Sequence, residues 1–544
     1  MFALTGVRHT SYFPRRSSNL SVILRKRSAD AGPPKLTTVN NQTVRVAAVD
    51  LGATSGRVCA VTVGPNQLDL AEVARFVDPT VMVPNSAGGY TLTLDVLAIW
   101  AGIVDGLQLM AAEGPVDGIG VDAWAVDYGL LDDDGSLIAN PTNYRDTRAN
   151  GISDKLFAES GVDFTELYRR TGIQFLPFNT VFQLAAEKAD NPTRFNNANQ
   201  FLMLPDLFNY WLCGATETAR VTEITNASST ALVNPVTRDW DYELIDKLAY
   251  PRNVFPNIVE AGTIIGTAAG VPFSGAEQVP VIAVGSHDTA SAIVAVPMVN
   301  DVETSAYISS GTWSLVGLEL PEPVLTDEAR EINATNELGI DGTVRFLRNT
   351  MGLWLLSQSQ EQWKSEGIDI PLSELLAQAA QIPANQWLID ADSSEFLAPG
   401  TMSTRIANAA AMPSTEESET PAAPPVETKG MKPKPETPAE ITRCIMDSLA
   451  TAYAKSVREL SAAAGRQVET IYIVGGGSQN TLLCQLTADA TGCKVVAGPV
   501  EAAALGNALV QARTLGVIEG GLPQIRDLVR RTQTLTEYYP NSVG

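Results

Sequence analysis

Histidine and cysteine are scarce in this chain of 544 residues. Its two histidines are His9 and His287, so a histidine-rich zinc site cannot be built, and a Ser-His-Asp triad would have to use His287. The five cysteines form no C-x-x-C pair, and their number is odd. So few cysteines in a large chain are typical of a reduced, intracellular protein, and we expect this one in the cytoplasm.

Long apolar runs and excess positive charge are also missing. No stretch of about 18 apolar residues occurs, so we expect no membrane span. The formal net charge is -23 and the pI about 4.5, and such a surface repels nucleic-acid phosphates and anionic membranes. We therefore predict no nucleic-acid or membrane partner. A local nucleotide site stays open, because backbone N–H groups and a metal ion can hold phosphates. The sequence does not indicate an oligomeric state.

Two segments differ from the rest of the chain. Residues 1–43 are basic and rich in serine, with no acid before Asp30. This composition predicts a disordered extension, and a transit peptide is the alternative. Residues 413–440 are rich in Pro, Glu, Thr and Lys. Such a segment cannot bury apolar area, so we predict a mobile surface insertion there.

Short apolar strands alternate with helical patterns between these segments. Strands are predicted at Val44–Val49, Val279–Val284 and Ile471–Val474, and helices at Leu353–Trp363 and Ile441–Ala464. Several of the strands run into glycine-rich turns. This alternation predicts an α/β fold with binding sites at the strand ends, and a chain of this length suits two or three domains.

The turn DLGATSGR at residues 50–57 follows the first strand. Its two glycines permit a tight turn and a close approach of the backbone to a ligand. Thr54 and Ser55 can cradle phosphate oxygens, Asp50 can bind a metal-bound water, and Arg57 can offset transition-state charge. An ordinary β-hairpin turn is the alternative.

A second turn of the same kind lies at Ser309–Gly317, where residues 308–314 repeat the pattern of residues 49–55. Thr312 is its best candidate for a phosphate contact. Two related halves that face each other would place both turns on one cleft. Chance similarity, or a plain hairpin with a buried Trp313, is the alternative.

The segment Gly285–Ser291 places a carboxylate between a buried strand and the start of a helix. Asp288 could act as a general base that takes the proton of a sugar hydroxyl, with the helix N-terminus keeping it ionised. His287 and Thr289 would hydrogen-bond the sugar. The alternative is a simple helix N-cap at Asp288.

Two further segments suit flat or polyhydroxylated ligands. Val474–Asn480 has three glycines after a strand, which can form a shelf for adenine and ribose; it matches neither the dinucleotide fingerprint nor the Walker P-loop. Asp122–Tyr128 places acids and aromatic rings at a strand end, and sugars are bound by such groups. Half-buried packing is the alternative for Trp124.

In this order, Asp50–Arg57, Gly285–Ser291, Ser309–Gly317 and Gly475–Asn480 resemble the motifs of the FGGY carbohydrate kinases. The resemblance is strongest to the branch that phosphorylates L-rhamnulose and covers roughly residues 44–536, apart from the insertion. Five more specific strings carry it: Asn140–Arg148, Gly172–Thr180, Thr225–Thr230, Asn349–Leu355 and Ala497–Ala502.

The resemblance implies two RNase H-like, actin-like ATPase domains that close on a cleft for ATP and sugar, with Mg²⁺ as cofactor. The first, over residues 44–295, would bind sugar and phosphate, and the second, over residues 296–536, would bind the nucleotide. The implied reaction converts ATP and L-rhamnulose to L-rhamnulose 1-phosphate, with Asp288 as the proton acceptor.

The implied contacts fall into three groups. Those to ATP are Ala53, Thr54, Ser55, Gly56, Arg57, Thr312, Gly476 and Ser357, the last standing where the family commonly has a glutamine. Those to the sugar are Ala125, His287, Asp288, Thr289 and Asn349, with Ala125 in place of a common glycine. Those to the metal are Asp50 and Asp288.

Other functions stay open beside this one. Kinases for fuculose, xylulose or glycerol share the motifs, because a few contacts set the preference for a hydroxyl. A non-catalytic sugar or nucleotide sensor is a second alternative, since a fold does not impose an activity. A chaperone or filament-forming relative of actin is the third.

Overall fold

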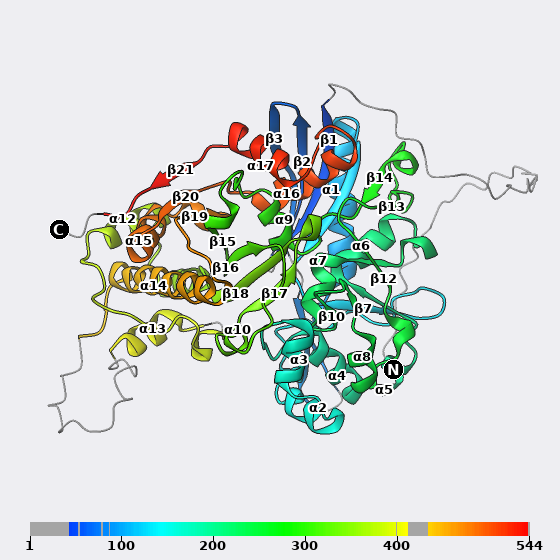
Figure 1. Ribbon diagram of the computed structural model, residues 1–544, viewed down its shortest axis with the longest axis horizontal. Coiled ribbons are helices and arrows are strands. Elements are labelled where there is room, and N and C mark those ends of the chain that lie inside the picture. The colour runs from blue at the N-terminus through cyan, green and yellow to red at the C-terminus, as the bar shows by residue number, and fades with distance from the viewer. Residues whose placement is uncertain are drawn as a thin grey trace, which may run out of the picture. The chain divides into compact units, whose positions relative to one another are not determined.

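The computed structural model describes residues 43–52, 55–77, 80–85, 88–398, 400–411 and 433–541. The predicted extension over residues 1–43 lies almost wholly outside the described residues, as do Ala53, Thr54 and most of the predicted insertion. The described chain contains two large β-sheets, each packed between helices (Figure 1).

The first sheet has six strands in the order β13-β14-β6-β1-β2-β3. Strands β1 and β2 are antiparallel, β1 and β6 are parallel, and β6 and β14 are parallel. The bounds are β1 Val44–Leu51, β2 Ser55–Gly64, β3 Gln67–Val77, β6 Gly118–Ala123, β13 Ile264–Thr267 and β14 Pro280–Ile282.

The second sheet has seven strands in the order β17-β18-β16-β15-β19-β20-β21. Strands β15 and β16 are antiparallel, β15 and β19 are parallel, and β19 and β20 are parallel. The bounds are β15 Ser305–Ser310, β16 Trp313–Leu320, β17 Thr335–Leu338, β18 Val344–Met351, β19 Thr470–Val474, β20 Lys494–Ala497 and β21 Thr536–Tyr538.

The two sheets repeat one topology. In each, a hairpin (β1–β2 or β15–β16) is flanked by a third antiparallel strand on one side and by two parallel strands on the other. The α/β fold and the repeated strand–turn–strand units predicted from the sequence are therefore confirmed. Because a turn closes each hairpin at the same end, equivalent turns lie at equivalent places in the two halves.

Two helices, α9 (Asp288–Val294) and α16 (Ala502–Thr514), pack against faces of both sheets. A Cβ atom added to Gly506 would lie 1.7 Å from the Ser291 carbonyl oxygen, so only glycine allows this close approach of the helices. Polar groups of α16 also bond strands of the first sheet: Gln511 Nε2 donates to the Ala47 carbonyl at 2.9 Å, and Asn507 Nδ2 donates to Gly120 O at 3.2 Å.

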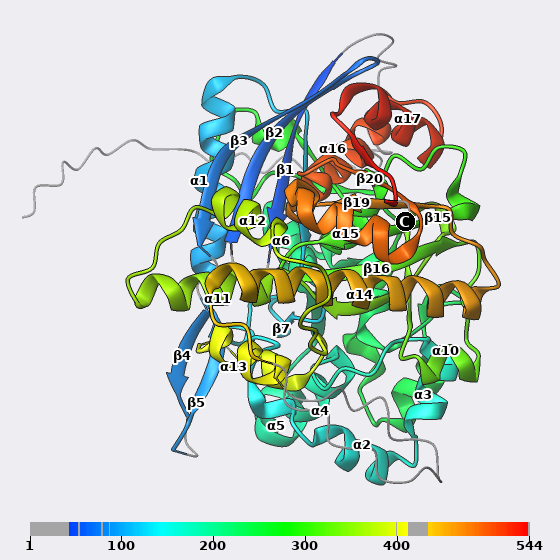
Figure 2. The same ribbon diagram turned by 90° about the vertical axis from the view of Figure 1, so that its left-hand side faces the viewer.

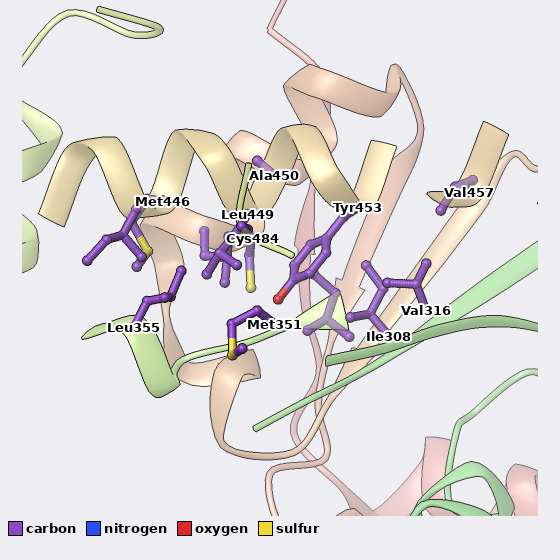
Figure 3. Close-up of a cluster of buried hydrophobic side chains, with 14 of the residues drawn as sticks. Ile308, Val316, Met351, Leu355, Met446, Leu449, Ala450, Tyr453, Val457 and Cys484 are labelled. Atoms are coloured by element: carbon purple, nitrogen blue, oxygen red, sulfur yellow. The ribbon is translucent and has the colours of Figure 1, made fainter. Parts of the chain in front are cut away.

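The long helix α14 (Pro438–Ala464) covers the other face of the second sheet (Figure 2). Its buried side chains meet those of the sheet and of α15 (Thr481–Thr491); Figure 3 shows Tyr453 of α14 beside Ile308 and Val316. The hydroxyl of Tyr453 lies 2.6 Å from that of Ser314, so this core contains a satisfied polar pair.

Helix α14 starts earlier than predicted. Thr437 and Glu440 form a capping box, in which each side chain bonds the backbone N–H of the other residue. The predicted insertion to residue 440 was therefore wrong at its end, because residues 438–440 are helical. The T-x-x-E pattern before an apolar run is a known helix-start signal that the composition of the segment obscured.

One helix in the described part of the chain, α1 (Val96–Glu113), is long and apolar enough to cross a membrane by length and composition. Its sequence is not a continuous apolar run, because Asp105 and Gln108 interrupt it. The helix packs against β2 and β3, with Ile99 and Ile103 buried.

The remaining elements connect or flank the sheets. The helices are α2 Ile152–Ser160, α3 Phe164–Thr171, α4 Thr180–Asp190, α5 Pro192–Asn196, α6 Leu204–Leu212, α7 Ile224–Ala227, α8 Tyr242–Lys247, α10 Asp327–Glu331, α11 Trp354–Ser365, α12 Leu372–Ala380, α13 Met402–Ala410 and α17 Leu522–Thr532. The short strand pairs are β4 Thr80–Pro84 with β5 Tyr90–Leu94, β7 Tyr128–Leu131 with β8 Gln200–Met203, β9 Val221–Glu223 with β12 Asn257–Val259, and β10 Val233–Asn234 with β11 Asp239–Trp240.

Candidate active site

A cavity of about 530 Å³ lies at the strand ends of both sheets. It brings together most of the described residues that the sequence predicted for a site. These are Asp50, Ser55, Arg57, Ala125, His287, Asp288, Thr289, Thr312, Asn349 and Gly476. The two predicted turns therefore line a single cavity, as the internal repeat suggested.

Two predicted residues lie elsewhere. Ser357 of α11 lines a separate surface depression, and its hydroxyl donates to the Leu353 carbonyl at 3.0 Å. Gly56 does not line the cavity: a Cβ atom there would lie 2.3 Å from the ring of Phe76, so this glycine serves the packing of β2. The structure therefore does not bring Ser357 to the predicted ATP contacts.

Arg57 of the first turn contacts two carboxylates, those of Asp50 and Glu501. Glu501 stands directly before α16 in the second half of the chain and was not predicted from the sequence. Burial alone would lower the pKa of Arg57, but the two carboxylates hold it above its ordinary value. The guanidinium is thus a permanent positive charge held at the cavity wall, joining residues from both halves.

The glycine shelf follows β19 and lies against the second turn. A Cβ atom at Gly477 would lie 2.0 Å from Ser310 Oγ, whereas one at Gly476 would meet no atom within 4 Å. Gly475 has a φ of 83°, in the left-handed region. Gly477 therefore allows the shelf to approach the turn, and Gly476 leaves an open strip of backbone beside the cavity.

Asp288 is the first residue of α9, and its side chain is 30% exposed. Its Oδ1 accepts hydrogen bonds from the backbone and the hydroxyl of Thr289, the latter at 3.1 Å. Burial raises the pKa of Asp288 above its ordinary value, and His287 and these hydrogen bonds only partly oppose it. Desolvation of the carboxylate thus opposes the stabilisation of its ionised form that we expected from the helix N-terminus.

His287 is buried between charged groups from the two halves. Its Nε2 lies 3.5 Å from Asp288 Oδ1, and its Nδ1 lies 3.1 Å from Glu337 Oε2. Arg345, which is 1% exposed, places its two terminal nitrogens 3.2 and 3.3 Å from the same Nδ1. Burial opposes ionisation of Glu337, but Arg345 and His287 lower its pKa below its ordinary value.

Glu223 hydrogen-bonds the loop that precedes Asp288 in the sequence. Its Oε2 accepts hydrogen bonds from Ser286 N at 3.0 Å and Ser286 Oγ at 2.8 Å, and from Thr225 N at 3.0 Å. Burial raises the pKa of Glu223 to about 7, although these hydrogen bonds lower it. The sequence offered no sign of this role, because Glu223 lies far from the loop along the chain.

The acids of Asp122–Tyr128 do not line the cavity. Asp127 accepts a hydrogen bond from Trp124 Nε1 at 2.8 Å and is fully buried, and Tyr128 packs against Phe201. Only residues 124–126 of the segment reach the cavity. The expectation that its carboxylates face a sugar was therefore wrong, because Asp122 and Asp127 are both fully buried.

Aromatic rings from other segments complete the wall. Tyr144, Phe178 and Trp313 line the cavity, and the rings of Tyr144 and Phe178 lie 5.3 Å apart. Flat apolar faces beside carboxylates, hydroxyls and amides suit a ligand with C–H faces and many hydroxyls.

Comparison with known families decides the relationship. The N-terminal domain of the FGGY family of carbohydrate kinases matches residues 46–295, and the C-terminal domain of that family matches residues 306–515. The chain belongs to the FGGY family of carbohydrate kinases. It is therefore a sugar kinase, an enzyme that transfers a phosphoryl group from ATP to a sugar.

Curated relatives of this FGGY kinase cover nearly its full length. It is 40% identical over 498 residues to the rhamnulokinase of Enterobacter sp. (strain 638), covering 91% of this chain and 94% of the relative. The rhamnulokinase of Yersinia pestis (strain Pestoides F) is 40% identical over 477 residues, or 87% of this chain and 90% of the relative.

Solved structures share the fold of this FGGY kinase. The ligand-bound xylulose kinase of Lactobacillus acidophilus matches with a TM-score of 0.69 and 16% identity, over 91% of this chain and 94% of that one. The glycerol kinase of Plasmodium falciparum with ADP matches with a TM-score of 0.67 and 16% identity, over 92% of this chain and 95% of that one. The two-domain fold with actin-like ATPase architecture is thus confirmed.

Kinases of this kind typically need a divalent metal, and the cavity offers ligands for one. Asp50 and Asp288 line the same cavity. No group of three or more His, Cys, Asp or Glu side chains is placed to hold a metal in the described chain. Two carboxylates still fit Mg²⁺, because this ion usually binds one or two carboxylates and completes its shell with water and substrate phosphates.

Proposed function

We propose that this FGGY kinase phosphorylates L-rhamnulose to L-rhamnulose 1-phosphate, with Asp288 as the general base. The observation that carries the proposal is the position of Asp288, whose carboxylate lies in the cavity that both phosphate turns line. The relatives with 40% identity over 91% of the chain are named rhamnulokinases, which supports this sugar over the other ketoses.

The base acts on the hydroxyl that attacks ATP. Asp288 takes the proton as the sugar oxygen forms its bond to the γ-phosphorus and the bond from that phosphorus to the β-phosphate oxygen breaks. A raised pKa makes Asp288 a stronger base than an ordinary aspartate. His287 and Thr289, on either side of it, are proposed to hold the sugar hydroxyls.

The nucleotide is proposed to lie between the two turns and the glycine shelf. Ser55 and Thr312 would hydrogen-bond its phosphates, Arg57 would offset their charge, and Gly476 would contact its adenosine part. When bound, Mg²⁺ would neutralise phosphate charge, held through Asp50 and Asp288. Phosphates would then compete with Asp50 and Glu501 for Arg57, so we expect this guanidinium to change partners when ATP binds.

Domain boundaries near residues 295 and 296 and a cytoplasmic location remain predictions. Ala125, which lines the cavity, is proposed to contact the sugar through its methyl group. Other ketoses and glycerol stay as alternative substrates for the same site.

A sugar panel tests the proposal. ADP release is measured with L-rhamnulose, L-fuculose, D-xylulose and glycerol, each over a range of concentrations at saturating ATP. We expect the highest kcat/KM for L-rhamnulose. A higher value for another member of the panel overturns the sugar assignment, and ADP release that no sugar stimulates overturns the kinase assignment itself.

A further inference from the structure

Gln174 and Asn349 come from opposite halves of the chain and meet at the wall of the cavity. Gln174 follows α3 and is 5% exposed, while Asn349 lies half-buried in β18. Both side chains line the cavity, together with His287, Asp288 and Thr289. An amide pair thus stands in the same cavity as the base.

The hydrogen bonds between the two amides fix the orientation of each. The backbone N–H of Asn349 donates to Gln174 Oε1 at 3.2 Å, and Asn349 Nδ2 donates to the same oxygen at 3.1 Å. A backbone N–H can only donate, so the Gln174 atom that faces it is the amide oxygen. Because that oxygen can only accept, the Asn349 atom beside it is the amide nitrogen.

One donor and one acceptor are therefore left over. Gln174 Nε2 and Asn349 Oδ1 have no hydrogen-bond partner among the residues that the structure describes. Both side chains line the cavity, so these two groups are open to a polar ligand that enters it. Both are neutral, which suits hydroxyl groups better than phosphates, whose charge calls for cations or arrays of N–H groups.

The pair is also held firmly. Asn179 Nδ2 donates to the Gln174 carbonyl at 2.7 Å, and Asn336 N donates to the Gly172 carbonyl at 2.8 Å. These two hydrogen bonds fix the loop that carries Gln174. Asn349 lies within β18, between β16 and β17. Groups that are fixed before binding give more affinity and more discrimination, because less freedom is lost on binding.

We propose that Gln174 is a specificity-determining sugar contact: its Nε2 donates to one sugar hydroxyl while Asn349 Oδ1 accepts from a neighbouring one. The inference rests on the proposed function, since it names the groups that would recognise the hydroxyls of that sugar. Neighbouring hydroxyls match the pair, because each hydroxyl can donate and accept. A sugar that lacks one of them leaves a buried amide group unpaired, and sites of this kind reject such analogues strongly.

Steady-state kinetics of Gln174→Met test the proposal, using whichever ketose the wild type phosphorylates best. Methionine keeps the length but removes both the free donor and the oxygen that accepts from Asn349. We expect the KM for the sugar to rise about tenfold and the KM for ATP to change little, with some loss of melting temperature from the two lost hydrogen bonds. The matched control is Gln511→Met: Gln511 is a buried glutamine, bonded to the Ala47 carbonyl and to Asn507 Oδ1, that does not line the cavity. It should leave the KM for the sugar unchanged.

Monodeoxy analogues of that ketose separate contact from structural support. For the analogue that lacks the hydroxyl at Gln174, wild type and Gln174→Met should have equal kcat/KM. An equal loss with every analogue, or an unchanged KM for the sugar, overturns the proposal. If Gln174→Met does not fold, Gln174→Asn, which withdraws the amide by one methylene, is measured in the same way. Wild-type activity on none of the ketoses overturns the proposed function instead, so the two failures are distinct.

Discussion

Glu337 Oε2 lies 3.1 Å from Nδ1 of His287, which joins a strand of the second sheet to the loop before Asp288 in the first half. The other imidazole nitrogen faces Asp288. Glu337 thus fixes the orientation of the imidazole from the side opposite the proposed base. The imidazole in turn positions the carboxylate of Asp288. A histidine held in this way has one preferred orientation.

Replacing Glu337 by glutamine should weaken this arrangement. We expect Glu337→Gln to lower kcat/KM for the sugar about tenfold or more and to move the acidic limb of its pH profile to lower pH, because removal of a nearby negative charge favours the ionised form of Asp288. The control is Glu319→Gln, which breaks an equally buried ion pair with Arg526 that does not line the cavity. It should lower the melting temperature and leave the pH profile unchanged. Equal profiles for the two variants would exclude a positioning role for Glu337.

Removal of the proposed base should separate binding from chemistry. We expect Asp288→Asn to lower kcat about 10²–10⁴-fold, the usual contribution of a general base, with little loss of sugar or ATP affinity. Single-turnover kinetics give the chemical step, and calorimetric titration gives the two affinities. If the variant keeps substantial kcat, Asp288 is not the base.

The pH dependence of kcat/KM should show the raised pKa of Asp288. The base must be deprotonated to act, so activity falls as the pH falls through its pKa. Because burial raises this pKa, the acidic limb should lie above about 3.9, the ordinary value for aspartate. Glu223→Gln should leave the acidic limb at the same pH, which distinguishes Asp288 from the other buried acid near the loop. A limb at or below the ordinary value contradicts the assignment.

Two neighbouring glycines of the shelf should respond differently to alanine. Gly476→Ala adds a methyl group that meets no protein atom within 4 Å, so we expect normal stability and a raised KM for ATP. Gly477→Ala places the methyl group 2.0 Å from Ser310 Oγ, so we expect a loss of about 1–3 kcal/mol of stability. Thermal melting and ATP kinetics on both variants check this. A normal KM for ATP in Gly476→Ala would count against the shelf as a nucleotide contact.

The stability of the protein should depend on pH through Glu223. Burial raises the pKa of this group to about 7 in the folded chain, so the folded state binds a proton that the unfolded state has released. Its contribution is therefore fully present below the unfolded pKa and is lost as pH rises through about 7, a change of roughly 3 kcal/mol. The difference in unfolding free energy between wild type and Glu223→Gln, measured from pH 4 to 9 in urea, should shrink or reverse along this range. A constant difference would show that Glu223 does not titrate there.

Local patterns were enough to find the elements that hold the site. The strands before Asp50 and Gly475 and the hairpin turn at Thr312 were predictable, because apolar runs that end in glycine and hydroxyl residues encode a strand and a turn within a few residues. Asp288 was found in the same way, as a carboxylate between a buried strand and a helix. Such signals involve only neighbouring residues, so a single sequence is enough to detect them.

Partnerships across the chain were not predictable. Glu501 beside Arg57, Glu337 beside His287 and Asn349 beside Gln174 pair residues from opposite halves, and no local pattern links them. The burial of the acids near Trp124 was not predicted, for a related reason. Whether a carboxylate at a strand end faces a cavity or the core depends on what packs against it, here Gln183 and the Trp124 indole.

The sequence alone established the α/β class, the paired turns and the family resemblance, because strand periodicity, glycine turns and motif order are properties of neighbouring residues. Only the tertiary structure decided which side chains share the cavity and how burial and pairing act on their pKa values. Burial raises the pKa of Asp288 against the expected effect of the helix end, and the carboxylates of Asp50 and Glu501 hold Arg57 at the wall. Desolvation and pairing depend on the whole packed chain, so they emerge only when both halves are folded together.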